Sequence, residues 1–172
     1  MKKILITGPE SSGKSFLAKA LATHFNGRLV AEYAREYLSK RPTYKQEDLA
    51  FIASNQYNRE HLAQSATANY VFCDTGIEVI KIWSHEKYQS VSPLIVDLYQ
   101  KSNYDLVLLC KPNIPWEPDV LRENPTDRDR LFRIYHSELK AKYPEMVIID
   151  APINHRINQA IQFILDLDKG LG

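Results

Sequence analysis

The sequence predicts an α/β doubly wound domain, in which a five-stranded parallel sheet carries helices on both faces. Five short apolar runs are continuous rather than alternating, which is typical of strands that are covered on both sides. Longer stretches with helical character separate these runs, and regular alternation of strand and helix is the pattern of a parallel sheet. Residues 1–172 have the size of a single domain with its own core.

The expected elements follow one another in order along the chain. Strands are expected at residues 3–7, 27–31, 70–74, 104–110 and 146–150. Helices are expected at residues 15–25, 46–68, 126–143 and 154–169. The helices are supported by apolar residues spaced on one face, by good helix formers, or by candidate caps such as Thr126 and Asp127. Two segments resist regular structure, because residues 32–45 mix charges with Pro42 and residues 111–126 carry four prolines.

Composition excludes several classes of function. The formal net charge of +1 gives no general attraction to nucleic acid or to an anionic membrane, so we expect neither as a partner. No apolar run approaches the roughly 18 residues that span a bilayer, and the N-terminal apolar run is too short for a signal peptide. Cys73 and Cys110 lie inside expected strands, so we expect reduced core thiols and a cytoplasmic protein. No heptad or exposed apolar stripe predicts an oligomeric state.

A phosphate-binding loop stands between the first expected strand and the first expected helix. Gly8, Gly13, Lys14 and Ser15 have the G-x4-G-K-S spacing of the P-loop. The glycines let successive backbone N–H groups face phosphate oxygens, and the start of the helix adds its positive dipole end. We therefore expect the fold of a P-loop NTPase with a bound nucleoside triphosphate. The expected contacts to it are Gly8, Glu10, Ser11, Ser12, Gly13, Lys14, Ser15 and Phe16.

A magnesium site is expected beside this loop. The Ser15 hydroxyl is of a size to ligate Mg²⁺, and Asp74 ends an apolar run that we expect to neighbour the first strand. The alternative for an Asp at the end of a strand is an ordinary turn residue. For Asp150, which ends the last expected strand, a role in the site and a role as an ordinary turn residue are equally expected.

The length of the chain favours a small-molecule kinase over other P-loop proteins. No N/T-K-x-D stretch follows the fourth expected strand, as a GTPase would require. A motor or an AAA-type ATPase needs more chain than 172 residues, so we expect neither. A kinase needs three further parts: an acceptor pocket, a carboxylate that takes or orients the acceptor proton, and cations that close over the transferring phosphoryl group.

A carboxylate suited to the acceptor follows the second expected strand. Glu32 would stand at the C-terminal edge of the sheet, where α/β folds bind ligands, and can accept a proton from a hydroxyl group. Arg35 lies three residues further, and it would share a face with Glu32 if a helix started here. The alternating charges of this segment equally fit a solvent-exposed helix without a functional role.

A proline-interrupted segment at about residues 111–130 is expected to form a lid. It carries Arg122 and Arg128, and a guanidinium fork pairs well with the charge on a transferring phosphoryl group. The alternative is a solvated loop whose arginines are neutralised by neighbouring aspartates. Trp116, between two prolines of the same segment, is either a packing residue or a stacking plate for a flat ring.

Several of these segments together resemble the ribosylnicotinamide kinase domain of bacterial NadR-type proteins. The similar segments are "GPESSGKS", "AEYARE", "FCDTG", "KIW", "YDLVLLC", "IPWEPDVLRENP" and the following "R..LF..Y", from about residue 3 to residue 165. The resemblance implies a nucleoside-kinase-like fold and phosphorylation of the 5′-hydroxyl of nicotinamide riboside by ATP with Mg²⁺. By position it implies Lys14 and Ser15 at the phosphates and metal, Asp74 at the magnesium, Glu32 and Arg35 at the acceptor, and Arg122 in the lid.

Two departures from the family pattern limit what is carried over. The chain begins at its first strand and has no H-x-G-H-type nucleotidyl-transfer stretch, so adenylyl transfer and repression are not expected. Ala31 stands where some relatives have an aromatic residue before the E-Y-x-R-E stretch. We therefore expect the nicotinamide to stack on Trp116, Trp83 or Tyr57, or the acceptor to be a different nucleoside.

The sequence thus predicts an ATP-dependent kinase for a small nucleoside. Catalytic roles are expected for Lys14, Glu32, Asp74, Arg122 and Arg128, and substrate contacts for Glu32, Arg35, Tyr57, Asp74, Trp83 and Trp116. Whether Glu32 or Asp74 orients the hydroxyl stays open, because a loose transition state needs positioning more than basicity. The remaining alternatives are a kinase for another nucleoside and a regulatory module that hydrolyses ATP slowly.

Overall fold

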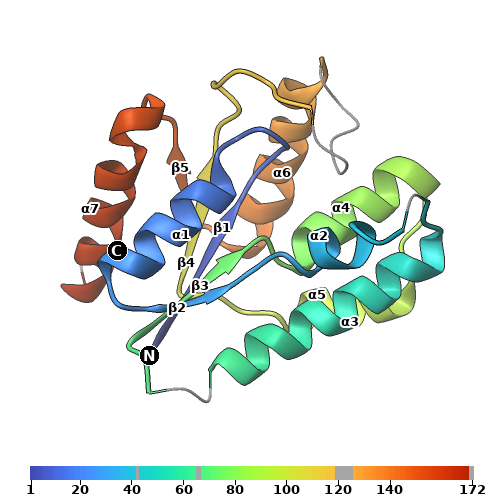
Figure 1. Cartoon of the computed structure of the whole chain (residues 1–172), viewed down its shortest axis with the longest axis horizontal. Coiled ribbons are helices and arrows are strands. Elements are labelled where there is room, and N and C mark those ends of the chain that lie inside the picture. The colour runs from blue at the N-terminus through green and yellow to red at the C-terminus, as the bar shows by residue number, and fades with distance from the viewer. Residues whose placement is uncertain (42, 65–66, 119–125, 171–172) are drawn as a thin grey trace.

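A five-stranded parallel sheet forms the centre of the molecule (Figure 1). The structure is a computed structural model, and it describes the chain except for residues 42, 65–66, 119–125 and 171–172. The strands are β1 (Lys2–Thr7), β2 (Arg28–Val30), β3 (Tyr70–Asp74), β4 (Leu106–Cys110) and β5 (Val147–Ile149). Their spatial order is β2-β3-β1-β4-β5, and every neighbouring pair is parallel. The predicted strands and their parallel arrangement are confirmed.

Helices cover both faces of this sheet (Figure 1). On one face pack α1 (Lys14–His24) and α7 (Arg156–Asp168), the latter preceded by the short 3-10 turn η1 (Ile153–His155). On the other face pack α3 (Gln46–Ala63), α4 (Ile77–Tyr88) and α6 (Arg128–Lys142). An outer cluster joins α3 and α4 to α2 (Tyr33–Leu38) and α5 (Pro93–Lys101). The phosphate loop and the segments after β2, β3 and β4 therefore meet at the C-terminal edge of the sheet.

The sheet divides the hydrophobic core into two halves, because successive side chains of a strand point to opposite faces. Ile4 and Ile6 of β1 are fully buried on the α1 and α7 side. Leu5, between them, is fully buried on the α3, α4 and α6 side. Cys110 and Cys73 lie in opposite halves as free buried thiols, as predicted. Both faces of each central strand are covered, which explains why the apolar runs do not alternate.

Three helices lie where none was predicted. The segment that was expected to resist regular structure contains α2, and the chain between β3 and β4 forms α4 and α5. The sequence of α4 is rich in β-branched residues, which have a weak intrinsic preference for helix. Only nine residues long, α5 begins with Pro93 behind the capping hydroxyl of Ser92. Packing against α3, rather than local propensity, accounts for these helices.

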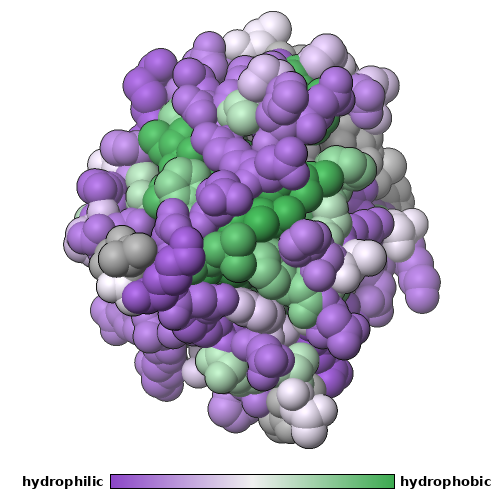
Figure 2. All heavy atoms as spheres, turned by 90° about the vertical axis from the view of Figure 1, so that its left-hand side faces the viewer, coloured by the Kyte–Doolittle hydropathy of each residue, from purple (hydrophilic) through white to green (hydrophobic). Residues whose placement is uncertain are grey.

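Apolar side chains also reach the surface beside α7. Figure 2 shows the α7 side of the molecule, with a band of hydrophobic surface between hydrophilic side chains. On α7 itself, Leu165 is 37% exposed, and Ile161 and Phe163 are only partly buried. Within the described part of the chain, no helix combines the length and the apolar character that crossing a membrane requires.

A buried polar network connects α3 to the sheet. The Lys3 ammonium lies 2.6 Å from Glu60 Oε2, and both side chains are almost completely buried. The Tyr104 hydroxyl donates to the same carboxylate oxygen over 2.9 Å, and the Gln56 amide donates to the other oxygen over 3.2 Å. These partners satisfy the polar groups that α3 places on its buried face.

Removing one member of the buried ion pair should destabilise the fold strongly. We expect Glu60→Leu to lower the free energy of unfolding by about 3–5 kcal/mol, because Lys3 is left as a buried charge without its partner. In the double variant Lys3→Met/Glu60→Leu, about 2 kcal/mol or more of that loss should be recovered. Urea denaturation of the two single variants and the double variant measures these values. If the loss of unfolding free energy in the double variant equals the sum of the losses in the single variants, Lys3 and Glu60 are not coupled.

Candidate functional site

The loop between β1 and α1 has the backbone geometry of a phosphate cradle. Gly8 has a φ of +143°, and a Cβ at this position would lie 2.5 Å from the Cys110 carbonyl oxygen at the end of β4. Gly13, with a φ of +77°, is the N-cap residue of α1, so the helix begins at Lys14 as expected. Ser11 also has a positive φ of 49°. Since L side chains rarely adopt such values, the turn requires glycine at both ends and additional support at Ser11.

Two arginines support this loop from outside. The Arg128 guanidinium donates to the carbonyl oxygens of Ser11 and Ile114, over 3.1 and 2.9 Å. The Arg156 guanidinium donates to the Ser12 carbonyl oxygen. In addition, the Glu117 backbone N–H donates to the Ser11 hydroxyl over 3.2 Å. The loop is therefore attached to the segment after β4 and to the starts of α6 and α7.

A cavity of about 520 Å³ opens above this loop, within the volume range of small-molecule sites. Its lining from the loop and α1 comprises Gly8, Pro9, Glu10, Ser11, Ser12, Gly13, Lys14, Ser15 and Phe16. The remaining lining residues are Glu32, Arg35, Val79, Ile82, Trp83, Glu86, Ile114, Pro115, Glu117, Leu131, Tyr135 and Ile153. All eight predicted phosphate contacts are thus brought together on one wall.

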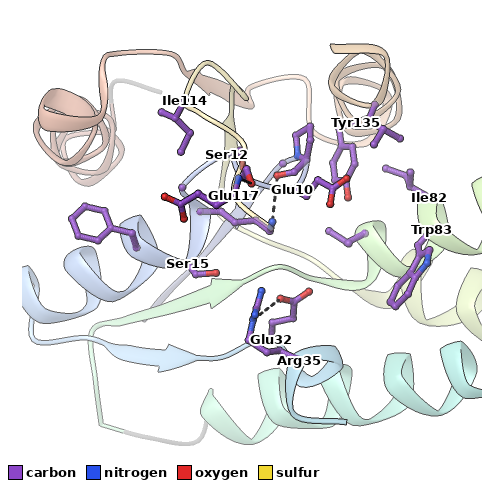
Figure 3. A pocket seen from close by; sticks show the side chains of 18 of the residues that line it. Glu10, Ser12, Ser15, Glu32, Arg35, Ile82, Trp83, Ile114, Glu117 and Tyr135 are labelled. Carbon is purple, nitrogen blue, oxygen red and sulfur yellow. Dashed lines mark hydrogen bonds and ion pairs between the residues drawn. The ribbon is translucent and has the colours of Figure 1, made fainter. Parts of the chain in front are cut away.

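The opposite wall carries the predicted acceptor residues. Figure 3 shows Glu32 and Arg35 pointing into the cavity from the side that faces Ser15. Arg35 Nε lies 3.8 Å from Glu32 Oε2, and the Glu32 side chain is only 15% exposed. Trp83 and Ile82 of α4 lie at one end, with Tyr135 of α6 across from them (Figure 3). A carboxylate, a cation and two aromatic rings therefore share one cavity with the phosphate loop.

A single amide side chain joins the two segments that carry the predicted carboxylates. The Gln56 carbonyl oxygen accepts the Tyr33 backbone N–H over 2.9 Å, directly after Glu32. The Gln56 amide donates to the Thr75 carbonyl oxygen over 3.3 Å, directly after Asp74. Gln56 is 2% exposed, so these contacts are shielded from solvent. Its position fixes the end of β2 relative to the end of β3.

Of the predicted metal residues, Ser15 lines the cavity, whereas Asp74, at the end of β3, is not among its described lining residues. Asp74 is 6% exposed, and its Oδ1 atom has no hydrogen-bond partner among the described residues. Burial raises the pKa of the Asp74 carboxyl group, while the Ser15 hydroxyl and then Lys14 act in the opposite direction. The buried Ser12 hydroxyl oxygen also has no partner within the described chain. Unpaired buried oxygens at one edge are what a site for hydrated Mg²⁺ and phosphate requires.

The other predicted residues differ in their relation to the cavity. Trp83 lines it, and its indole N–H donates to the Tyr44 hydroxyl over 2.8 Å. Tyr57 packs against the outer helical cluster, and neither it nor the half-buried Trp116 is among the described lining residues. Arg128 binds backbone carbonyls rather than facing the cavity. Arg122 lies outside the residues that the structure describes.

Sequence reasoning missed Gln56 and Arg156, although a signal for both is present. On α3, Gln56 and Glu60 occupy the same face as the buried residues Leu49, Ile52, Ala53 and Ala63. On α7, Arg156 occupies the same face as the buried residues Ala160 and Ile164. Polar or charged residues at core positions of a helix need buried partners, which makes them candidates for structural or functional roles.

Known proteins are similar to this chain over most of its length. A family described as an AAA domain matches residues 3–156. The trifunctional NAD biosynthesis/regulator protein NadR of Salmonella typhimurium is 25% identical over 97% of this chain, and that of Escherichia coli is 28% identical over 76%. The chain spans 43% and 33% of the lengths of these two proteins. The predicted resemblance to NadR-type proteins is confirmed, whereas excluding an AAA-type domain was wrong, because chain length does not separate this family from other P-loop domains.

Solved structures share the fold. A NadR protein in complex with NR superposes with a TM-score of 0.79 at 23% identity, covering 96% of this chain and 51% of that one. A NadR protein in complex with NAD and AMP-PNP gives 0.77 at 24% identity, covering 96% and 49%. Deoxyadenosine kinase from M. mycoides, with dCMP and dCDP bound, gives 0.69 at 13% identity, covering 95% and 99%. The predicted fold, that of P-loop nucleoside kinases, is confirmed.

Another carboxylate, Glu78, is buried in the first turn of α4. Burial raises its pKa to about 7, and the nearby Glu60 carboxylate adds to this shift, while hydrogen bonds to its own backbone N–H and to Thr7 oppose it. Its Oε1 atom has no partner within the described chain. The folded protein therefore binds a proton at Glu78 more tightly than the unfolded chain, whose carboxyl group has a pKa of 4.5.

This difference makes folding stability depend on pH in a defined direction. The contribution of Glu78 is fully present below about pH 4.5 and is lost as the pH rises through about 7. We expect Glu78→Gln to remove this loss, so that its stability relative to the wild type grows by on the order of 3 kcal/mol between pH 4.5 and pH 8. Chemical denaturation over this pH range measures the difference. The control variant Glu145→Gln, at an exposed loop residue, should follow the wild type; equal behaviour of the two variants would contradict the assignment.

Proposed function

The chain belongs to the AAA domain family that matches residues 3–156, and from that premise we propose that it is an ATP-dependent kinase for nicotinamide riboside. It transfers the γ-phosphoryl group to the 5′-hydroxyl and forms nicotinamide mononucleotide for NAD synthesis. The observation that carries this proposal is one cavity with a phosphate loop on one wall and Glu32 with Arg35 on the other. The similarity to NadR, whose solved structures contain NR or NAD with AMP-PNP, supports the choice of substrates.

The charge of the cavity supports a cationic acceptor. Its described lining contains four carboxylates, Glu10, Glu32, Glu86 and Glu117, against two basic groups, Lys14 and Arg35. The nicotinamide ring of the riboside carries a positive charge, unlike the bases of common nucleosides. A cation over an aromatic face gains roughly 0.5–2 kcal/mol, and Trp83 and Tyr135 both line this cavity. Trp83 is therefore our first choice for the ring, ahead of Tyr57 and Trp116.

The P-loop residues hold the triphosphate in this proposal. The backbone N–H groups of residues 8–15 and the start of α1 bind phosphate oxygens, and Lys14 supplies a positive charge to the β and γ phosphates. Lys14 Nζ now lies 3.4 Å from the Pro9 carbonyl oxygen, a weak contact that it can exchange for phosphate. The predicted contacts Glu10 and Phe16 line the same wall.

The residues beneath the loop fit a magnesium ion. Ser15 and Asp74 would hold it, because the Asp74 Oδ1 atom has no partner among the described residues and Mg²⁺ favours one or two protein oxygens together with phosphates and water. In the described part of the chain no group of three or more His, Cys, Asp or Glu residues could hold a metal alone, which agrees with an ion shared with the nucleotide. When bound, the ion neutralises charge on the β and γ phosphates.

Glu32 orients the acceptor hydroxyl in our preferred mechanism. Its carboxylate lies on the wall opposite the P-loop and is held by the Gln56 contact to the following residue, whereas Asp74 lies deeper, beneath Ser15. Arg35 compensates the charge of Glu32 and lines the same cavity as the phosphate loop. Residues 111–130 act as a lid within one domain of residues 1–172, in which Arg128 keeps the lid base on the P-loop and Arg122 closes over the phosphoryl group. Because ATP is the donor, we place the reaction in the cytoplasm.

Purified protein should release ADP from MgATP in the presence of nicotinamide riboside, and mass spectrometry should identify nicotinamide mononucleotide. We expect kcat/KM to exceed that for adenosine or uridine by about 10-fold or more, since those acceptors lose the contact of the cationic ring with aromatic faces. A preference for another nucleoside would favour the alternative kinase, for which the deoxyadenosine kinase fold provides support. ATP binding without any phosphorylated product would favour a regulatory module.

Replacing Glu32 tests its role in the chemistry. We expect Glu32→Gln to lower kcat by about 10²-fold or more while the KM for ATP stays unchanged, because the amide cannot take the hydroxyl proton. Glu36, on the short helix that begins directly after Glu32, is 58% exposed and pairs with Arg59, so Glu36→Gln should retain full turnover. Lys14→Ala should lose ATP binding in contrast to both. Full turnover in Glu32→Gln would assign the role to Asp74.

A further inference from the structure

Arg156 is the most deeply buried basic residue next to the phosphate loop. It is 1% exposed and stands at the first position of α7. Its guanidinium donates to three backbone carbonyl oxygens, those of Ser12, Lys111 and Ala151, and to the side-chain oxygen of Asn113. One side chain therefore connects the P-loop with the segments that follow β4 and β5.

Among the residues that the structure describes, no carboxylate forms an ion pair with this guanidinium. All four acceptors are neutral oxygens, and Asp150, which acts on Arg156 electrostatically, is exposed and accepts a hydrogen bond from Gln159. Burial lowers the pKa of Arg156, as expected for a cation that is removed from water. Hydrogen bonds to neutral oxygens compensate such a buried charge only in part, so a nearby ligand of opposite charge would stabilise it further.

The guanidinium also lies directly behind the turn that would face phosphate. A Cβ placed on Gly13 would lie 3.6 Å from Arg156 Nη1. The hydrogen bond from the same group to the Ser12 carbonyl holds that oxygen on the side of the loop where Arg156 lies. An oxygen turned toward the cavity would repel phosphate, whereas an oxygen held behind the loop leaves the inner side to N–H groups.

We propose that Arg156 is a positioning residue for the nucleotide, one that aims the P-loop at the phosphates and attracts them with a positive charge from behind the loop. The inference rests on the proposed nucleotide site but not on the identity of the acceptor. Arg156 acts through Ser12 and through space, without touching the phosphates. Its contribution therefore grows with the number of phosphate groups in the ligand.

The test compares nucleotides on three variants by isothermal titration calorimetry with Mg²⁺. We expect Arg156→Met to weaken AMP-PNP binding by about 30-fold, the effect of unit charges about 8 Å apart at an effective dielectric constant near 20. AMP, which has no β or γ phosphate, should lose much less affinity. Arg156→Lys keeps the charge without the fork and should stay within about 5-fold of the wild type for AMP-PNP. Arg28→Met, at an exposed arginine where β2 begins, should match the wild type.

Each result decides between the possible roles of Arg156. Equal losses for AMP and AMP-PNP, or equal losses for Arg156→Lys and Arg156→Met, would show a merely structural residue and overturn the proposal. AMP-PNP affinity in Arg156→Met within 3-fold of the wild type would overturn it as well. If Arg156→Met does not fold, Arg156→Lys alone tests the proposal. A loss of AMP-PNP affinity of more than about 30-fold in that variant would overturn it. Absence of AMP-PNP binding in the wild type would refute the nucleotide site itself.

Discussion

The phosphate loop depends on where its own carbonyl groups point. A loop can face phosphate with N–H groups only if the carbonyl oxygens of the same peptides find donors elsewhere, because buried carbonyls need partners. Arg128 supplies a donor to Ser11, and Arg156 supplies one to Ser12. These arginines begin α6 and α7, more than a hundred residues further along the chain. The geometry of the P-loop is therefore a tertiary property, although its motif is local.

On the acceptor side, too, backbone groups are held by a side chain from elsewhere in the chain, here an amide instead of the guanidinium groups. Gln56 binds one backbone group after β2 and another after β3, so the segments that carry Glu32 and Asp74 share one support. The amide is itself held by Glu60, which binds Lys3 and Tyr104 in the core. A chain of buried polar contacts thus connects the interior of the sheet to both carboxylates, and its members are fully satisfied only in one arrangement.

Local patterns predicted the strands and the phosphate half of the site, because both depend on residues that are neighbours in the sequence. Continuous apolar runs identified the covered strands, and the glycine spacing identified the loop. The helices α4 and α5 were missed since packing on α3 outweighs the weak helix preference of α4. Trp116 and Tyr57 were expected at the substrate but do not line the described cavity, because an aromatic side chain in a sequence does not reveal which way it packs.

The phosphate loop and the opposite wall of the cavity therefore carry different information about function. The fold is shared with a protein that is only 13% identical, so the fold alone leaves the acceptor undetermined. The opposite wall, where we propose that the acceptor binds, combines Glu32 and Arg35 with residues of α4 and α6, and the positions of these two helices follow from packing rather than from a motif. Related folds can exchange acceptors by changing this wall while the phosphate loop is retained. In this chain the described lining of the whole cavity combines Trp83 and Tyr135 with an excess of carboxylates, and our proposal of a flat cationic ring rests on that combination rather than on the fold.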